Sequence, residues 1–417
     1  MAIDSLIYMA ETRRQALLET TSTLKTSLPL RFFRQQAHYT TPASNYKLAH
    51  SAATRGFEPA LKIFARYNIT FEDLAEALEV PLPAVEAFSQ SSPRAPLVML
   101  DGEDAQALDD TVVAQGRQNA VDIFRQADWG GTLRFYRPSG LALPYCVEDL
   151  VRVLSQAGSG RPAEAFPIDG IIFPKLEHGP GIDWVCSVLD ELEARLGLEA
   201  NSIKLQFLVE SGWSVMNLPE LVQRSLPRLA GIIFGIADYT ADLGLPEIRY
   251  DHPVCDWARA AVVNSAGAAG VPAIDAMTVN YPVTDAALSA TENRQRILDR
   301  LRECYQDTLH SIDLGMNGKW VGHPAQLFVV LLAYHLHLSS GVVQAEVDKI
   351  RAYQAALAEK VGATIIGGVM SDRATDRHAR ARLRQAVALG LLSPQEALAL
   401  GIISEEEAAG MKGDSAL

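Results

Sequence analysis

Two acidic side chains, Glu210 and Asp238, each lie at the end of a short apolar run and could bind a metal ion. The runs are LQFLVES (205–211) and GIIFGIAD (231–238), and they follow one another along the chain. Two carboxylates with water and substrate oxygens form a typical Mg²⁺ site, and Mn²⁺ accepts the same ligands. No group of His or Cys residues in the sequence competes for zinc. The pattern makes Glu210 and Asp238 candidates for a metal site, although two acids at strand ends are on their own a weak signal.

Arg137 and the adjacent acids Glu103 and Asp104 end two other apolar runs. A guanidinium can hold a substrate carboxylate or carbonyl, or stabilise the oxygen of an enolate. Adjacent residues on a regular strand face opposite ways, but where a strand ends the chain turns and both acids could reach one pocket. Arg137 could equally be a structural partner of Glu103 or Asp104, and one residue could do both.

Further runs end in Lys175, Asp275 and His323. If all these ends meet, one pocket collects at least three carboxylates, an arginine, a lysine and a histidine. The alternative is that some of them cap loops or form salt bridges outside the pocket. For Lys175 and Asp275 the sequence leaves both interpretations open.

The elements that would position these residues are buried strands alternating with amphipathic helices. Continuous apolar runs suit strands buried on both faces, as in parallel sheets. Eight such units favour a closed (β/α)₈ TIM barrel over an open doubly wound sheet, and in a barrel the carboxyl ends of all strands meet at the active-site face. The expected strands are 37–44, 97–104, 132–138, 170–175, 205–211, 231–238, 271–277 and 318–324.

The segments outside this alternation are predicted to be helical. We assign residues 1–345 to the barrel, with an N-terminal helix and a helical insertion at about 45–95, and residues 346–417 to a C-terminal helical lid or appendage. The insertion contains a Val-Pro-Leu-Pro break between two stretches of helical periodicity. It resembles a helix-turn-helix, but its acidic surroundings favour a structural helical pair over DNA binding.

Composition narrows the class of protein. Of 417 residues, 48% are hydrophobic and 21% charged, so a large core is expected and global disorder is not. The formal net charge of −13 gives no basic footprint for nucleic acid. The four cysteines are far apart and form no CxxC pair, which indicates reduced thiols in a cytoplasmic protein. No stretch approaches 18 uninterrupted apolar residues, so no membrane span is expected.

Seven motifs in order resemble the citrate lyase β-subunit-like and malyl-CoA lyase family, part of the HpcH/HpaI aldolase group. The resemblance covers about 280 residues and implies a divergent member with an N-terminal helical insertion. The motifs are LDGEDA (100–105), RPSGLALPYCVEDL (137–150), GIIFPK (170–175), LVESGWSVMNLPEL (208–221), FGIADYTADLG (234–244), GKWVGHPAQ (318–326) and GGVMSDRATDRHA (367–379).

The resemblance assigns roles to most of the residues above. It implies that Glu210 and Asp238 bind magnesium and that Arg137 stabilises the enolate or the carbonyl from which it forms. Glu103 and Asp104 would be partners of the metal site and of Arg137.

A second group of roles concerns the lid and the last strand. Asp372 would be the acid/base at the methyl carbon of the acyl-CoA enolate. In the family this Asp often comes from the lid of a neighbouring subunit, which implies a homo-oligomer, often a trimer or hexamer. Lys175, His323, Pro324 and Gln326 would shape the pocket and bind substrate.

The implied reaction is the Mg²⁺-dependent cleavage, or formation, of a malyl-CoA- or citramalyl-CoA-like β-hydroxyacyl thioester. The products would be acetyl-CoA and a 2-oxo acid. Three alternatives stay open: a CoA-independent class II aldolase on a hydroxy-oxo acid, a malate synthase- or malyl-CoA thioesterase-like enzyme, and a barrel that binds a metabolite or partner without turnover.

The chain departs from the family pattern in the length of the spacer after the first strand. That spacer holds the helical insertion and follows a strand end on the active-site face, so it could narrow the pocket or obstruct a CoA arm. Smaller departures are Gly102, Ser211 and Trp213, where the family commonly has Leu, Thr and a small residue. Basic residues that could contact CoA phosphates are Arg373, Arg377 and Arg380.

Overall fold

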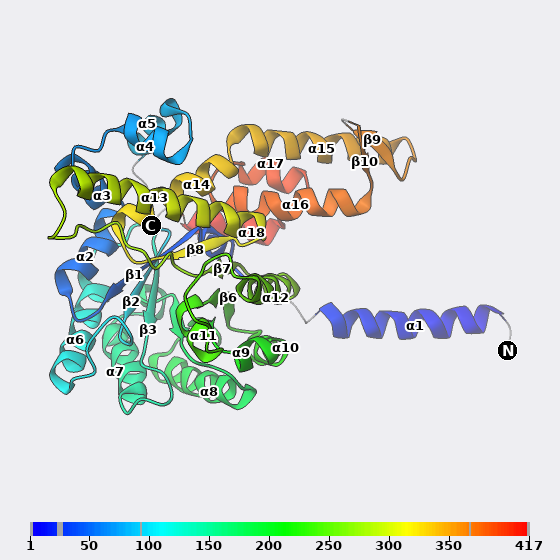
Figure 1. Ribbon diagram of the computed structural model, residues 1–417. Coiled ribbons are helices and arrows are strands. Elements are labelled where there is room, and N and C mark those ends of the chain that lie inside the picture. The colour runs from blue at the N-terminus through cyan, green and yellow to red at the C-terminus, as the bar shows by residue number, and fades with distance from the viewer. Residues whose placement is uncertain (1–2, 23–27, 92–93, 367, 415–417) are drawn as a thin grey trace.

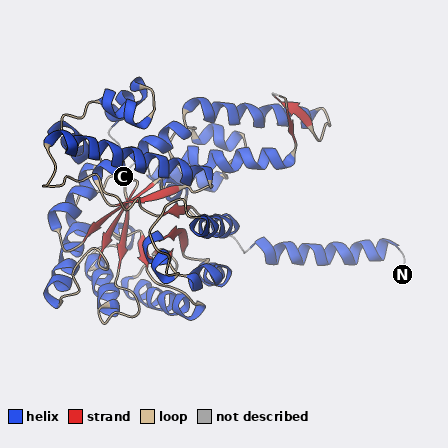
Figure 2. Cartoon of the chain, viewed as in Figure 1, coloured by secondary structure: helices blue, strands red, loops and turns tan. Residues whose placement is uncertain are grey.

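Eight parallel strands form a closed barrel at the centre of the molecule (Figures 1 and 2). The computed structural model describes residues 3–22, 28–91, 94–366 and 368–414. Each strand pairs with the next one along the chain and β8 pairs with β1, so the predicted (β/α)₈ barrel is confirmed. The strands are β1 Ala37–Pro42, β2 Leu97–Asp101, β3 Leu133–Arg137, β4 Gly170–Phe173, β5 Lys204–Val209, β6 Leu229–Phe234, β7 Ala273–Asp275 and β8 Gly318–Val321.

The outer layer consists of helices that follow the strands, and side-chain caps fix where several of them begin. Ser289 caps its helix through a reciprocal capping box with Glu292, and Asp109 accepts the backbone N–H of Thr111 at 3.0 Å. The helices are α6 Asp110–Gln126, α7 Cys146–Gly158, α8 Gly179–Leu196, α9 Gly212–Met216, α10 Leu218–Ser225, α11 Ile236–Asp242, α12 Pro253–Ala269, α13 Ala290–Asp313 and α14 Pro324–His337.

A buried polar cluster closes the end of the barrel at which the strands begin. Gln206 Nε2 donates to Gln35 Oε1 at 2.7 Å, and His38 Nε2 lies 2.8 Å from the same oxygen. All three side chains are buried, and burial lowers the pKa of His38 to about 3, so its ring is neutral at neutral pH. This cluster separates the interior of the barrel from the surface at that end.

The insertion after β1 forms four short helices on the outer layer. The predicted break lies between α4 and α5, where Glu79 adopts a left-handed conformation with φ +57°. The insertion packs on α6, α13 and α14, and Phe57, Phe64 and Phe88 surround Phe328 of α14. These contacts give no support to the expectation that the insertion narrows the pocket. The helices are α2 Tyr46–Arg55, α3 Glu58–Arg66, α4 Phe71–Leu78 and α5 Leu82–Ser91.

The C-terminal part forms a second core beside the end of the barrel where strands begin. It unites α15, α16 and α17 with Leu30 of the 3₁₀ helix η1, which directly precedes β1. Arg34 Nε donates to the carbonyl of Ala388 at 2.7 Å, and Gln385 donates to the carbonyl of Asn317 at 3.2 Å. The elements are η1 Leu30–Arg34, α15 Ser340–Ala358, β9 Thr364–Ile366, β10 Val369–Ser371, α16 Arg373–Ala388, α17 Pro394–Ala399 and α18 Glu405–Asp414.

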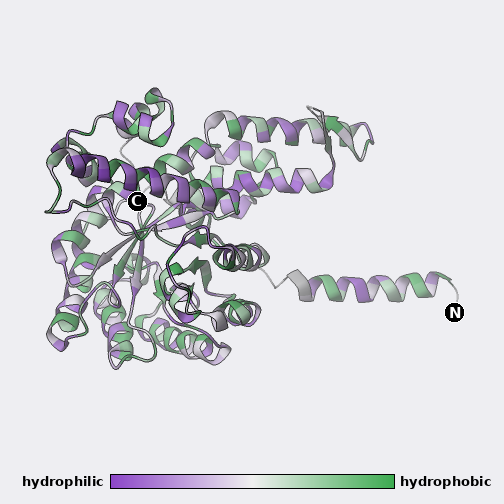
Figure 3. Ribbon diagram, viewed as in Figure 1, coloured by the Kyte–Doolittle hydropathy of each residue, from purple (hydrophilic) through white to green (hydrophobic). Residues whose placement is uncertain are grey.

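The domain boundary expected between residues 345 and 346 falls inside helix α15. Val343 and Val347 lie on either side of that position, and both belong to the second core. The appendage therefore begins structurally with Leu338, where this core starts along the chain after the barrel helix α14. At the other end of the chain, α1 (Ile3–Ser22) extends away from the barrel, with hydrophilic and hydrophobic residues alternating along it (Figure 3).

One segment, Pro324–Ala358, is by length and composition apolar enough to cross a membrane. It comprises α14 and α15, and 61% of its most apolar window is buried inside the protein. The middle of α14 packs in the barrel core, where Leu327, Val329 and Leu332 are fully buried. Packing of a core helix therefore accounts for its hydropathy.

Candidate active site at the carboxyl ends of the strands

Arg137 is held rigidly at the mouth of the barrel by Asp101. The two residues end neighbouring strands and are direct partners in the β2–β3 register. Their side chains form two parallel hydrogen bonds, Nε to Oδ1 and Nη2 to Oδ2, both 2.6 Å long. Trp320 of β8 lies against the guanidinium, with its ring centroid 5.3 Å from Cζ. Burial opposes the charge, but Asp101 and neighbouring acids raise the pKa of Arg137, which stays cationic at all working pH values.

Glu103 is a buried carboxyl between two cations. Its Oε2 lies 3.3 Å from Arg137 Nη1, and its Oε1 lies 3.3 Å from Lys175 Nζ. Neither oxygen has a hydrogen-bond partner among the residues that the structure describes. Burial raises the pKa of Glu103 to about 7. Asp104 is about half exposed and reaches the same two cations, at 3.3 Å from Arg137 and 3.5 Å from Lys175.

Glu210 directly follows β5 and is buried, with 4% of its surface exposed. Its Oε1 accepts the backbone N–H of Lys175 at 2.7 Å. Lys175 adopts φ +53°, a left-handed conformation that is uncommon outside glycine and clusters at functional sites. Burial and the nearby carboxylate of Asp238 raise the pKa of Glu210 to about 8. Asp238 lies in the first turn of α11, directly after β6.

The donors at this mouth fit a hard divalent cation. An ionised carboxylate that is buried beside a second acid is costly unless a cation neutralises it. Glu210 and Asp238 offer oxygen ligands, which Mg²⁺ prefers. Among the described residues there is no group of three or more His, Cys, Asp or Glu that could form a complete protein cage. Water and substrate oxygens would therefore supply the other ligands, as is common for Mg²⁺.

Comparison with known proteins identifies the family. The family model described as "Domain of unknown function (DUF6986)" matches residues 150–412. The L-malyl-CoA/beta-methylmalyl-CoA lyase of Rhodobacter capsulatus is 30% identical over 322 residues, which cover 73% of this chain and 91% of that protein. The chain belongs to the malyl-CoA lyase and citrate lyase β-subunit-like family.

One further relative agrees with this family, and one solved structure shares the fold. Citrate lyase subunit beta from Leuconostoc mesenteroides subsp. cremoris is 26% identical over 238 residues, covering 57% of this chain and 68% of that protein. The structure of protein CitE from Mycobacterium tuberculosis, in complex with magnesium, acetoacetate and coenzyme A, shares the fold with a TM-score of 0.51 at 20% identity. It covers 84% of this chain and 98% of that one. The protein is thus a carbon–carbon lyase of a family that acts on CoA thioesters.

Gly235 leaves space for the side chain of Glu210 in this lyase. A Cβ at position 235 would lie 3.0 Å from Glu210 Cβ and 3.1 Å from its Oε2. We expect Gly235→Ala to push the carboxylate aside and raise the Mg²⁺ concentration for half-maximal activity roughly 10- to 100-fold, as changes in the groups that orient a metal ligand do. Metal titration of turnover measures this. Gly267→Ala on α12, where a Cβ meets nothing within 4 Å, is the control; equal metal dependence of the two variants would contradict the assignment.

The residues predicted at the last strand lie at the mouth of the lyase and organise its loops. His323 caps α14 by accepting the N–H of Ala325 at 3.2 Å, and Pro324 is the first residue of that helix. Burial lowers the pKa of His323 to about 4, so the ring is neutral. Gln326 is fully buried; its amide donates to the carbonyl of Thr278 at 2.8 Å and accepts from Gly322 at 3.3 Å. The side-chain amide of Gln326 therefore joins the loop after β7 to the loop after β8.

Asp275 is part of a buried ion-pair network. It is fully buried and accepts hydrogen bonds from Arg259 Nε at 2.8 Å, from Ser311 at 2.6 Å and from Tyr250. Burial opposes its charge, but Arg259 and Lys319 lower the pKa of Asp275. Of the two interpretations left open by the sequence, the geometry favours the structural one.

Asp372 lies far from the other predicted residues of its own chain. It is the N-cap of α16 and accepts the N–H groups of Ala374 at 2.9 Å and Thr375 at 3.1 Å, which lower its pKa. Figure 1 shows that α16 begins beside β10, at the end of the α15–α16 pair that points away from the barrel. The structure brings Arg137, Glu103 and Glu210 together at one mouth, but it does not bring Asp372 to that mouth within one chain.

Two residues of the mouth are absent from the sequence-based list, namely Asp101 and Trp320. Asp101 stands in the LDGEDA motif, so a signal was present, but only the β2–β3 register shows that it pairs with Arg137. Trp320 lies on β8, whose pairing with β1 closes the barrel and brings the ring toward β3. No spacing in the sequence indicates that contact.

Proposed function

We propose that the protein is a Mg²⁺-dependent lyase that cleaves, or forms, a malyl-CoA- or citramalyl-CoA-like β-hydroxyacyl thioester. The products of cleavage are acetyl-CoA and a 2-oxo acid, glyoxylate or pyruvate. The observation that carries this proposal is the mouth shared by a buried Glu210 with Asp238 beside it and an Arg137 immobilised by Asp101. Mn²⁺ could replace Mg²⁺ with the same ligands.

The chain's own residues fit the two halves of the cleavage. Glu210 and Asp238 would hold the cation, which when bound polarises the carbonyl of the oxo acid. As the carbon–carbon bond breaks, its electron pair passes to the thioester fragment as an enolate, and this charge needs a fixed donor. Arg137 would provide it through Nη1, because Asp101 engages only Nε and Nη2. Glu103, whose oxygens have no described hydrogen-bond partner, would accept the proton that leaves the substrate hydroxyl.

The remaining step is protonation of the enolate carbon to give the methyl group of acetyl-CoA. Asp372 is the candidate acid, and we propose that it reaches the mouth of a neighbouring subunit in a homo-oligomer, a trimer or hexamer. Two observations support this. The appendage attaches at the opposite end of its own barrel, through Arg34 and Ala388, and Asp372 caps a helix that begins at the far tip of that appendage.

The test is turnover of malyl-CoA and citramalyl-CoA with Mg²⁺, beside a control in which EDTA removes the metal. We expect metal-dependent release of glyoxylate or pyruvate together with acetyl-CoA. Appearance of free CoA and malate would instead indicate a thioesterase or malate synthase activity. Failure with both thioesters, combined with cleavage of a free hydroxy-oxo acid, would replace the proposal by a CoA-independent aldolase.

A further inference from the structure

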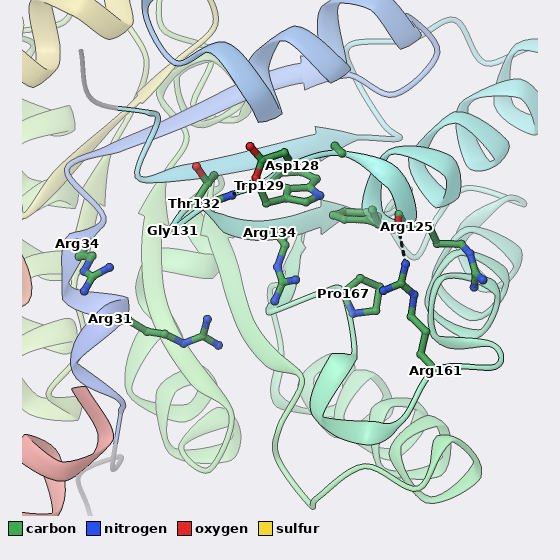
Figure 4. Close-up of a pocket in the computed structure, with 13 residues that line it drawn as sticks. Arg31, Arg34, Arg125, Asp128, Trp129, Gly131, Thr132, Arg134, Arg161 and Pro167 are labelled. Atoms are coloured by element: carbon green, nitrogen blue, oxygen red, sulfur yellow. Dashed lines mark hydrogen bonds between the residues drawn. The ribbon is translucent and has the colours of Figure 1, made fainter. Parts of the chain in front are cut away.

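An arginine-rich cleft of about 270 Å³ lies at the end of the barrel where the strands begin (Figure 4). Arg31 and Arg34 come from η1, Arg134 from β3, and Arg161 from the loop after α7. Each of these segments precedes a strand or begins one, so the cleft lies opposite the mouth that holds Arg137. The buried cluster around Gln35 separates the two.

The cleft carries more positive charge than its own acids neutralise. Arg31 Nη2 and Arg134 Nε share one buried carboxylate, Asp169, at 2.7 Å and 2.9 Å. Asp128 is the one acid among the described residues that line the cleft, and it pairs with Arg94 at 2.7 Å. A local surplus of cations stands out in a chain whose formal net charge is −13.

Arg34 and Arg161 line the cleft, and each uses one guanidinium nitrogen in a hydrogen bond to the described part of the chain. Arg161 donates through Nη2 to the carbonyl of Arg125 at 2.6 Å, but its buried Nε has no hydrogen-bond partner in the described part of the chain. Arg34 is anchored by Nε on Ala388, while its Nη1 lies 3.7 Å from where a Cβ of Gly131 would stand. Nη1 and Nη2 of Arg34 and Nη1 of Arg161 have no hydrogen-bond partner among the described residues, so an anion in the cleft can accept from them.

The size and walls of the cleft indicate what kind of anion fits. Arginine guanidinium groups match phosphate oxygens in bidentate geometry. A volume of about 270 Å³ lies at the small end of ligand pockets, which suits a compact ligand. Trp129 is 6% exposed and stacks on Phe124, with ring centroids 5.5 Å apart, so its ring offers no free face to a nucleobase.

We propose that this cleft binds a compact phosphoanhydride, either inorganic pyrophosphate or the diphosphate group of a nucleotide. Arg31, Arg34, Arg134 and Arg161 supply the charge, and the ligand is recognised by its phosphates alone. The site is separate from any CoA site at the mouth, since the closed barrel lies between them. The proposal stands independently of the reaction that the lyase catalyses.

The experiment is calorimetric titration of the full-length protein with pyrophosphate, ADP, AMP and citrate in EDTA buffer at constant ionic strength. We expect pyrophosphate to bind with a Kd below about 100 μM and AMP and citrate to bind far more weakly. If ADP binds as tightly as pyrophosphate, the ligand is the diphosphate group of a nucleotide. If pyrophosphate binds and ADP does not, the ligand is the free anion. Absence of pyrophosphate and ADP binding, or tighter binding of citrate, would overturn the proposal.

Substitutions of the cleft arginines test whether pyrophosphate binds in this cleft. Arg161→Gln removes a guanidinium that lines the cleft and should weaken pyrophosphate binding about tenfold or more, as loss of a charge-assisted hydrogen bond does. Arg31→Gln should act similarly, because Asp169 keeps Arg134 as its partner. Arg152→Gln, an exposed arginine on α7 outside the cleft, is the matched control and should bind as the unchanged protein does. Unchanged affinity in both cleft variants would overturn the site.

The cleft could also be a contact between subunits, and light scattering separates that case. We expect the cleft variants to keep the molar mass of the unchanged protein while they lose pyrophosphate. If Arg161→Gln changes the molar mass and the unchanged protein does not bind pyrophosphate, the cleft is an interface between subunits and not a ligand site.

Discussion

Glu210→Gln is expected to lower metal-dependent turnover about a thousandfold or more while the barrel stays folded. The substitution keeps the shape of the side chain and the oxygen that accepts the N–H of Lys175, so the loop after β4 keeps its contact. It removes the charge that Mg²⁺ needs in its ligand. In metal-free protein the melting temperature should stay the same or rise, because a neutral amide is buried beside Asp238 at less cost than a carboxylate.

Thermal unfolding with and without Mg²⁺ and oxalate, a mimic of a 2-oxo acid, tests whether the metal still binds the variant. A ligand that binds only the folded state raises the melting temperature, so the unchanged protein should be stabilised and Glu210→Gln should not. Glu220→Gln on α10 is the control, since Glu220 is exposed and pairs with Arg224. If Glu210→Gln keeps both its turnover and its stabilisation by Mg²⁺ with oxalate, Glu210 is not a metal ligand.

Two inactive variants are expected to restore activity when their subunits are mixed. Asp372→Asn should lower kcat about a hundredfold or more through loss of the acid. Asn still caps helix α16, so the lid stays folded. When Asp372→Asn and Glu210→Gln subunits are mixed equally and exchange, a site that joins an intact barrel to an intact neighbouring lid arises in about a quarter of cases. Turnover should therefore rise to about a quarter of that of the unchanged protein.

Turnover is measured before and after subunit exchange, with light scattering to confirm an oligomer of unchanged mass. Each variant alone, taken through the same exchange procedure, is the control. Turnover that stays at the average of the two variants would show that Asp372 does not act across a subunit boundary. Full activity of Asp372→Asn alone would remove it from the chemistry altogether.

Most strands of this barrel could be predicted because they lie in short, largely apolar runs that end in a polar residue. GIIF of β4 and LAGIIF of β6 are buried along their whole length, and such burial leaves a clear signal in a single sequence. The same rule placed Arg137 and Glu210 at one mouth, because all parallel strands of a barrel end on the same side. Those parts of the site depend on local patterns and on one topological rule.

Other features depend on contacts between distant segments, which periodicity does not encode. The insertion was predicted as helical, but its position follows from Phe57, Phe64 and Phe88 meeting Phe328 more than two hundred residues later. The arginines of the cleft come from four segments, namely η1, α6, β3 and the loop after α7, and they form no motif. The place of Asp372 depends on how the second core attaches to η1, which the motif around it does not reveal.

Helix α16 mechanically connects two ends of the molecule. Its last residue, Ala388, is held by Arg34 at the arginine-rich cleft, and its first turn is capped by Asp372. Sixteen residues rising 1.5 Å each make a rod of about 24 Å, so a tilt of about 5° at Ala388 displaces the other end by about 2 Å. Misplacement of a reacting group by about 1 Å can cost about a hundredfold in rate. If Asp372 serves a neighbouring subunit, the contact that fixes its position, between Arg34 and Ala388, lies in the subunit that donates Asp372. That contact is at the end of the barrel opposite the mouth and does not touch the substrate.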